Sequence, residues 1–246
     1  MREALRAGTR PLQRLLVLRT DRQFHDLVQL AKAQGVPVHI EPPQAFDRLA
    51  PGGHHQSVIA FVAAKSYDST EQILDRAKTR GENPFLVLLD GVEDPHNLGA
   101  VLRTAEAAGV HGGFIPGRRA VGLTSVVAKV SAGALDHISV GRVGNLIRLI
   151  QDLKEAGLWV YGVDPQAAKL HTEIDMTGPI ALVLGGEGEG LRPGVLGECD
   201  DHIRIPMQGR IQSLNVSAAA AITLFEVVRQ RRRGIVSEAK PSPDNS

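Results

Sequence analysis

The stretch IALVLGGEGEGLRPGVLGECDDHIRIPMQGRIQSLNVSAAAAITLFE, residues 180–226, decides the fold because it contains two short apolar runs that each end in a polar turn. The first run stops at the glycine-rich residues 185–190, where a backbone with few side chains can lie against a ligand. The second ends at residues 205–207 and leads to Ser213 and Asn215, one of which we expect to cap the helix that follows. Two strand ends that face one polar helix start predict a small-molecule site.

The composition is that of a globular protein with one or two domains, since 43% of the 246 residues are hydrophobic. Cys199 is the only cysteine, which excludes an internal disulfide and a cysteine-rich zinc site, and no metal site is predicted. No apolar stretch approaches the length of a membrane span, and the N-terminal residues lack a signal-peptide core. We therefore expect a cytoplasmic protein that does not insert into membranes.

Charge is distributed unevenly although the formal net charge is only +1. Arginines cluster within residues 1–22 and again within residues 229–233. Such patches can dock the phosphates of nucleic acids. The second cluster equally fits a solvated helix end, where cations interact favourably with the helix dipole.

The N-terminal part of the chain predicts a small α/β domain over residues 1–65. Its strand and helix patterns lie at residues 12–18, 22–34, 36–40, 44–49 and 58–63. A core of this size is thin, because small domains bury a lower fraction of their surface. Residues 66–83 are polar with one helical pattern at residues 70–79, and we interpret them as a linker.

Strand and helix patterns alternate over residues 84–234 and predict a mostly parallel sheet with helices on both faces. The run Phe85-Leu86-Val87-Leu88-Leu89 is continuously apolar, as in a parallel strand that is covered on both sides. The tail, residues 235–246, is expected to be disordered. The sequence thus predicts an α/β fold with one small and one large domain.

A polar turn and a helix follow the first strand of the large domain. Residues 98–108 have the pattern of a helix, for which Asn97 fits the N-cap. Arg103 lies nearly two turns along this helix, from where it can reach over the crevice in which open α/β sheets bind ligands. The ordinary alternative for Arg103 is a surface ion pair with Glu106 or Glu93.

Three ordered motifs resemble those of the SpoU (TrmH) branch of the SPOUT methyltransferases. They read Asn97-x-Gly99-x-x-x-Arg103-Thr104-Ala105, then Gly185-x-Glu187-Gly188-x-Gly190, then Ile205-Pro206-Met207 with Ser213-Leu214-Asn215-Val216-Ser217. The resemblance covers residues 84 to about 234. The N-terminal domain is similar to the L30e-like RNA-binding domain carried by members of the RlmB type, which methylate a guanosine of 23S rRNA.

The resemblance implies a fold that composition and periodicity do not predict. Family members thread the C-terminal part of the SPOUT domain through a loop to form a deep trefoil knot, and the knot forms the pocket for S-adenosyl-L-methionine. Backbone groups in that pocket hold the adenine of the cofactor. The positions of this chain that match them are Gly185, Ile205 and Leu214.

The resemblance also implies the catalytic residues, which are Arg103, Asn97, Glu187, Ser213 and Asn215. Asn97 and Glu187 would orient Arg103, while Ser213 and Asn215 would position the ribose or the loop itself. A guanidinium is practically always protonated, so we interpret Arg103 as gripping a phosphate and stabilising the developing alkoxide. Asn215 could instead serve only as a helix cap.

The implied function is methyl transfer to a ribose 2′-hydroxyl of RNA, with a guanosine of 23S rRNA as the favoured target. A tRNA 2′-O-methyltransferase and a thiopeptide-resistance rRNA methyltransferase are the alternatives within the family. Family members are homodimers that pack through the first and last helices of the catalytic domain, here residues 98–108 and 213–232. A ribosome-assembly factor that binds RNA without catalysis is the alternative of another class, and the presence of Arg103 and of the glycine turn argues against it.

Overall fold

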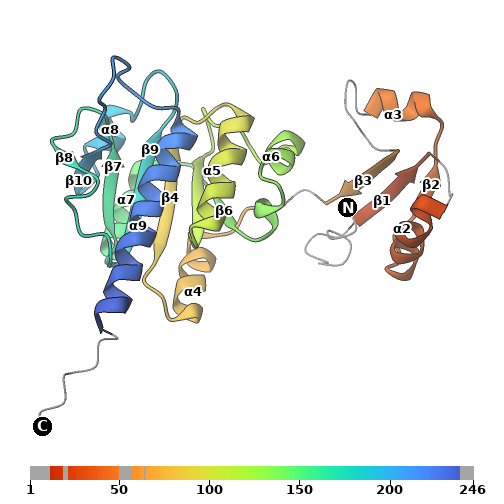
Figure 1. Ribbon diagram of the computed structural model, residues 1–246, viewed down its shortest axis with the longest axis horizontal. Coiled ribbons are helices and arrows are strands. Elements are labelled where there is room, and N and C mark those ends of the chain that lie inside the picture. The colour runs from red at the N-terminus through yellow and green to blue at the C-terminus, as the bar shows by residue number, and fades with distance from the viewer. Residues whose placement is uncertain (1–11, 19–21, 50–56, 64, 239–246) are drawn as a thin grey trace, which may run out of the picture. The chain divides into compact units, whose positions relative to one another are not determined.

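The chain forms two structural units. A computed structural model describes residues 12–18, 22–49, 57–63 and 65–238, and Figure 1 shows their helices and strands. The division between the units falls between Lys65 and Ser66. No helix in the described part of the chain is both long and apolar enough to span a membrane.

In its described residues the first unit is a small sheet with two helices. Its elements are β1 (Leu12–Val17), α2 (Arg22–Ala33), β2 (Val38–Ile40), α3 (Pro43–Leu49) and β3 (Val58–Val62). The strand order is β2-β1-β3, with β2 parallel and β3 antiparallel to β1. Side chains alternate along a strand, so Leu15 and Val17 join Leu27 of α2 in one apolar cluster.

The second unit is a larger sheet with helices on both faces. Its strands are β4 (Phe85–Asp90), β5 (Gly112–Pro116), β6 (Ser139–Val143), β7 (Trp159–Val163), β8 (Lys169–Leu170), β9 (Ile180–Gly185) and β10 (Asp201–Arg204). Its helices are α4 (Thr70–Arg80), α5 (Pro95–Ala107), α6 (Ser125–Val130), α7 (Leu146–Glu155), α8 (Pro193–Leu196) and α9 (Val216–Glu238), and a 3-10 turn lies at Ala134–Asp136.

The order of the strands determines which of them end beside one another. Among the described residues the large sheet runs β6-β5-β4-β9-β7-β10-β8, and every neighbouring pair is parallel. Strand β9 lies between β4 and β7 although both precede it in the chain. The turns that follow β4, β7, β9 and β10 therefore meet at one edge. The predicted α/β fold with a parallel sheet is confirmed, while the trefoil knot stays a prediction.

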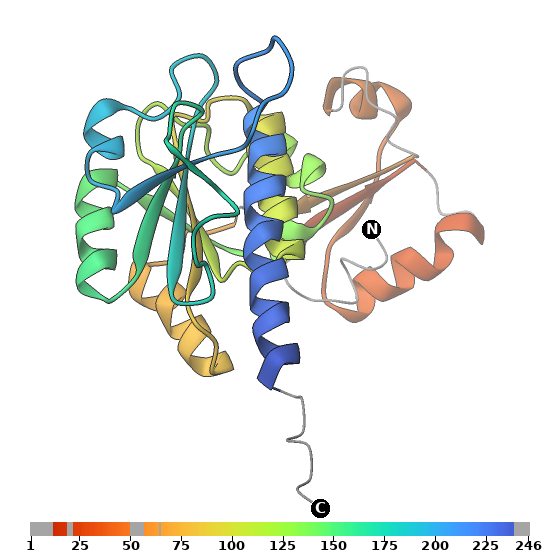
Figure 2. The same ribbon diagram turned by 60° about the vertical axis from the view of Figure 1, so that its left-hand side comes forward.

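The continuous apolar run of β4 is explained by two separate cores. Phe85, Val87 and Leu89 pack into the core that also contains the buried side chains of α5 and α9. Leu86 and Leu88 belong to the opposite core, with side chains of α4, α7 and α8. Helices α5 and α9 lie side by side on one face of the sheet in both views (Figures 1 and 2).

Two predicted boundaries are wrong. Residues 66–83 are not a linker, because α4 belongs to the second unit and its Ile73 is fully buried in the core shared with α7. Ser69 begins this helix with a capping box, in which its hydroxyl accepts from the backbone N–H of Gln72 and the Gln72 amide oxygen accepts in return. The disordered tail predicted from residue 235 begins too early, since α9 extends to Glu238, and the rest of that prediction, residues 239–246, lies outside the described residues.

His111 is a buried histidine that the fold holds neutral. Its Nδ1 accepts a hydrogen bond from the backbone N–H of Phe85 at 3.1 Å, so Nε2 carries the proton and donates to Glu82 at 3.0 Å. Burial lowers the pKa of His111, and the nearby Glu82 offsets this only in part. Protonation of Nδ1 would break the hydrogen bond at the start of β4.

We therefore expect the second unit to lose stability in mild acid. The unfolded chain protonates His111 near its ordinary pKa of about 6.5, so below that pH the unfolded state binds more protons and the free energy of unfolding falls. Urea unfolding can be followed by the fluorescence of Trp159, the only tryptophan. Between about pH 7.5 and about pH 5.5 the wild type should lose more stability than His111→Gln. This role of His111 would be contradicted if the wild type and His111→Gln lost equal stability. It would also be contradicted if the control His137→Gln, at an exposed site, differed from the wild type as much as His111→Gln does.

Candidate active site

Three polar side chains from three segments meet above the edge where β4 and β9 end. They are Asn97 of α5, Glu187 of the glycine turn after β9, and Asn215 just before α9. The Nδ2 groups of both asparagines donate to Oε1 of Glu187, at 2.5 Å from Asn97 and 2.8 Å from Asn215. Asn215 Nδ2 also donates to Oδ1 of Asn97 at 3.0 Å. The structure thus joins three of the predicted catalytic residues in one network.

Asn97 is not the N-cap of α5, which corrects the prediction. The helix begins earlier, with Pro95 at its first position and the Asp94 carboxylate accepting from the backbone N–H of His96 at 3.0 Å. Proline is favoured there because its missing N–H would have no helical partner. The Asn97 side chain is therefore free to face the network, and the residue is buried.

Asn215 serves both as a helix cap and as part of the network. Its Oδ1 accepts from the backbone N–H of Ser217 at 2.9 Å, which satisfies a free donor at the start of α9. Its Nδ2 is the group that donates to Glu187 and Asn97. The two roles that the sequence left as alternatives use opposite ends of the same amide.

A cavity of about 540 Å³ lies beside this network. The predicted cofactor-binding residues Gly185, Ile205 and Leu214 all line it, as do Ser213, Asn215 and Glu187. Val163, at the end of β7, and residues 164–166 after it form a further wall that the sequence analysis missed. The sequence feature that could have identified these residues is a polar turn directly after an apolar strand, the same feature that marks the other strand ends.

The glycine turn approaches its neighbours too closely for side chains. A Cβ added at Gly185 would lie 2.1 Å from the carbonyl carbon of Gly190, and one at Gly186 would lie 2.0 Å from the carbonyl oxygen of Gly91. Gly188 has a φ of +86°, in the left-handed region that favours glycine. The glycines therefore allow exposed backbone to line the cavity.

A second cavity of about 530 Å³ lies on the other side of the turn. Glu187 lines both cavities, and Asn97 lines only the second. Arg118, Arg119 and Arg192 also line the second cavity, and the sequence analysis did not single them out. The network therefore stands at the junction of two spaces, one glycine-rich and the other bordered by three arginines.

Arg103 does not join the network. It is exposed on the outer face of α5 and lines neither cavity. Within the described part of the chain no carboxylate lies within ion-pair distance of its guanidinium, so the surface ion pair with Glu106 or Glu93 is absent.

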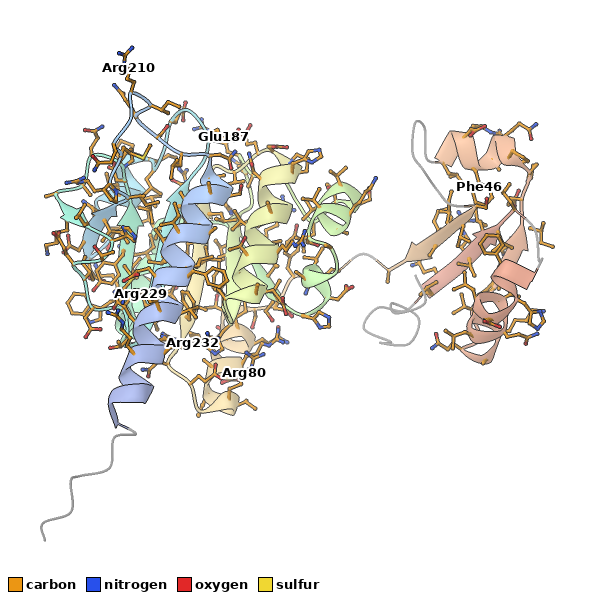
Figure 3. The ribbon with its side chains drawn as sticks, in the orientation of Figure 1. Phe46, Arg80, Glu187, Arg210, Arg229 and Arg232 are labelled. Atoms are coloured by element: carbon orange, nitrogen blue, oxygen red, sulfur yellow. The ribbon has the colours of Figure 1, made fainter. Side chains whose placement is uncertain are left out.

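The two basic clusters lie apart from this site or outside the described residues. Figure 3 shows Arg232 and Arg80 toward the end of the second unit opposite Glu187. Arg229 is paired with Glu226, and Arg231 donates to the carbonyl oxygens of Asn83, Pro84 and Gly178. These contacts favour the structural role for those two arginines. Most of the first cluster falls on residues 1–11 and 19–22, whose side chains are not described.

Two models of protein families match this chain. The model of the SpoU rRNA Methylase family matches residues 84–225, and the model for RNA 2'-O ribose methyltransferase substrate binding matches residues 1–68. The chain is 45% identical to the TrmH family tRNA/rRNA methyltransferase YacO of Bacillus subtilis over 209 residues, which are 85% of this chain and 84% of the relative. It is 40% identical to a TrmH family tRNA/rRNA methyltransferase of Staphylococcus aureus over 233 residues, 94% of this chain and 93% of the relative.

Solved structures show the same similarity. The SpoU methyltransferase AviRb from Streptomyces viridochromogenes, crystallised in complex with the cofactor AdoMet, superposes with a TM-score of 0.79 at 26% sequence identity. The match covers 94% of this chain and 87% of AviRb. A crystal structure of an RNA 2'-O ribose methyltransferase superposes with a TM-score of 0.70 at 26% identity, over 94% of this chain and 85% of that one.

Proposed function

Because the chain belongs to the SpoU rRNA Methylase family and is an RNA methyltransferase, we propose that it methylates a ribose 2′-hydroxyl with S-adenosylmethionine as the methyl donor. The observation that carries this proposal is the network of Asn97, Glu187 and Asn215 at the junction of two cavities. One cavity can hold the cofactor and the other can admit a nucleotide, so that methyl group and acceptor meet beside Glu187.

The cavity lined by Gly185, Ile205 and Leu214 fits the cofactor. Its volume of about 540 Å³ lies within the range of small-molecule pockets. The close approaches at Gly185 and Gly186 leave backbone amides and carbonyls, rather than side chains, along one wall. Backbone groups of this kind can hydrogen-bond the polar edge of an adenine, as the family resemblance implies.

The cofactor supplies an electrophilic methyl group, and the protein must position the ribose oxygen against it. Positioning two bound reactants can account for much of the rate of such a transfer. Glu187 would be held by the two asparagine amides and would orient Arg103, the cation that binds the substrate. Arg103 would grip a phosphate and stabilise the developing alkoxide, with the hydroxyl proton leaving to phosphate or water, while Ser213 would position the ribose.

A homodimer would explain why Arg103 faces outward. The outer face of α9 exposes Ile222 and Phe225, at 39% and 47% of their surfaces, next to the helix α5 that carries Arg103. These two side chains lie one helical turn apart on the same face of α9 and can form part of an apolar contact between copies. We propose that two copies pack through α5 and α9, which would place Arg103 at the interface. A fully active monomer in sedimentation experiments would contradict this arrangement.

We propose 23S rRNA, and a guanosine within it, as the substrate. Support comes from the match of residues 1–68 to a substrate-binding domain of RNA 2'-O ribose methyltransferases. The relatives are named for both tRNA and rRNA, so tRNA and a resistance-conferring site in rRNA are the alternatives. The trefoil knot, which the family resemblance implies, and the cytoplasmic location, which was expected from the sequence pattern, both stay predictions.

The function can be tested by incubating the protein with tritiated S-adenosylmethionine and either unmodified 23S rRNA or tRNA transcripts. Alkaline hydrolysis then separates ribose methylation, which protects the adjacent phosphodiester, from base methylation. Label in rRNA within alkali-resistant dinucleotides is the expected result. Label only in tRNA would contradict the assignment of 23S rRNA as the substrate. Label only in bases would contradict the assignment of the ribose 2′-hydroxyl as the methylated group.

Absence of label has two meanings that cofactor binding separates. If calorimetry shows that the protein binds S-adenosylmethionine, naked RNA is the wrong form of the substrate, and a ribosome-assembly intermediate should be labelled. If the protein binds RNA but not the cofactor, the non-catalytic assembly factor becomes the better account.

A further inference from the structure

Asp90 is a buried carboxylate at the carboxyl end of β4. Its side chain is completely shielded from solvent, and its partner Arg192 is half-exposed. Oδ1 of Asp90 lies 2.8 Å from Nε and 2.6 Å from Nη2 of Arg192, while Oδ2 accepts from the backbone N–H of Arg192 at 3.0 Å. Because a buried charge is costly without a hydrogen-bonded partner, the two residues depend on each other.

Asp90 holds both ends of the glycine turn. The backbone carbonyl of Asp90 accepts from the N–H of Gly186 at 2.7 Å, and its side chain binds Arg192 after the turn. Gly186 and Gly190 form a bridge within the turn. Residues 186–192 are thus folded back on themselves and fastened to the end of β4.

Asp90 and Arg192 lie on the side of the glycine turn that faces away from the cofactor cavity. Asp90 and Arg192 line the second cavity and not the first. The turn between the two cavities carries Glu187 and the backbone that follows Gly185. Any effect of Asp90 or Arg192 on the cofactor must therefore pass through the position of this turn.

We propose that Asp90 and Arg192 are positioning residues that hold the glycine turn in the conformation needed for cofactor binding and for the Glu187 network. The proposal rests on the proposed function, since the turn is assigned to the cofactor site there. Glu187 receives both of its asparagine hydrogen bonds through one oxygen, Oε1, so a small shift of the turn breaks both. A misplacement of about 1 Å can lower a rate by about 100-fold.

Substitutions of Arg192 test the proposal in the full-length protein. Arg192→Met keeps an unbranched side chain about as long as the aliphatic part of arginine but removes the guanidinium. We expect it to weaken S-adenosylmethionine binding by at least about tenfold in calorimetry and to lower kcat with RNA. Arg192→Lys should restore part of the affinity, because an ammonium can pair with Asp90 and the backbone hydrogen bond remains, although one ammonium cannot reproduce both guanidinium contacts. Arg148→Met, which breaks the exposed ion pair with Asp152 on α7, is the matched control and should change neither quantity.

The double variant Asp90→Asn/Arg192→Met separates positioning from stability. It removes the carboxylate that Arg192→Met leaves without its charged partner, so the urea midpoint should recover toward that of the wild type. Cofactor affinity should stay low, because the guanidinium no longer holds the far end of the turn and at most the backbone hydrogen bond at position 192 remains.

Two results would overturn the proposal. One is a double variant whose affinity recovers together with its stability, since the pair would then matter only for folding. The other is an Arg192→Met protein in which only the KM for RNA changes, since Arg192 would then contact RNA directly. A wild type that binds neither the cofactor nor RNA would instead contradict the proposed function itself.

Discussion

Arg103→Ala should lower kcat for RNA methylation by about 100- to 1000-fold, the usual effect of removing one group that stabilises developing charge. The affinity for S-adenosylmethionine should not change, because Arg103 lines neither cavity of the same chain. The guanidinium is exposed and, within the described part of the chain, has no carboxylate partner. Its removal therefore breaks no internal ion pair, and the unfolding midpoint should stay within the error of the measurement.

The experiment needs a control that separates substrate binding from chemistry. Arg103→Lys keeps the charge but cannot bind a phosphate through two parallel hydrogen bonds, so it should recover only a small part of kcat. Arg148→Ala removes an exposed arginine on α7, away from both cavities, and should leave kcat unchanged. An Arg103→Ala protein with wild-type kcat and a raised KM for RNA would show that Arg103 binds RNA but does not assist the chemical step.

Mixed dimers can test where Arg103 acts. If two copies form the enzyme, an inactive Arg103→Ala chain and an inactive Glu187→Ala chain should regain activity when they are mixed and allowed to exchange. Recovery requires that Arg103 of one copy serve the Glu187 site of the other. Mixtures that exchange subunits without recovering activity would place both residues in the same copy's site.

Gly186→Ala should destabilise the second unit by about 3 kcal/mol or more and abolish measurable cofactor binding. The added methyl group would lie 2.0 Å from the carbonyl oxygen of Gly91. Neither backbone can move freely, because Asp90 and Gly185 are paired in adjacent parallel strands. The strain must therefore be relieved by shifting the turn that carries Glu187.

Two other glycines provide matched controls for urea unfolding and calorimetry. Gly144 is exposed, with no atom within 4 Å of an added Cβ, so Gly144→Ala should be nearly neutral. Gly188 lies in the same turn, also with open space, but its φ of +86° strains an alanine by about 1 kcal/mol. If Gly186→Ala is no worse than Gly188→Ala, the turn is flexible enough to absorb a side chain and the close approach is unimportant.

The elements of the fold could be predicted because their signals are local. The apolar run of β4 indicates burial on two faces, and the structure shows a separate core on each. The start of α5 was misplaced because several polar residues between Asp90 and Asn97 can cap a helix. Asp94 followed by Pro95 was the better signal, since proline suits the first helical position.

The site could be predicted only as a set of residues and not as an arrangement. Asn97 and Glu187 are 90 residues apart, and Asn97 and Asn215 are 118 apart, yet each pair is hydrogen-bonded. Asp90 and Arg192, separated by 102 residues, form a pair that no local pattern indicates. These contacts arise because β9 is inserted between β4 and β7, and strand order depends on the packing of the whole unit.

The sequence by itself determined the two-part α/β organisation, most strands and helices, the glycine turn and the motifs of the family. Hydrogen bonding within a helix, alternation along a strand and the backbone freedom of glycine act over a few residues, so they leave a readable pattern. Only the tertiary structure decided that α4 joins the second core, that Asn97 faces the network, that Arg103 points outward and that Asp90 binds Arg192. Each of these outcomes depends on which distant segments become neighbours, and that is set by burial summed over the whole domain.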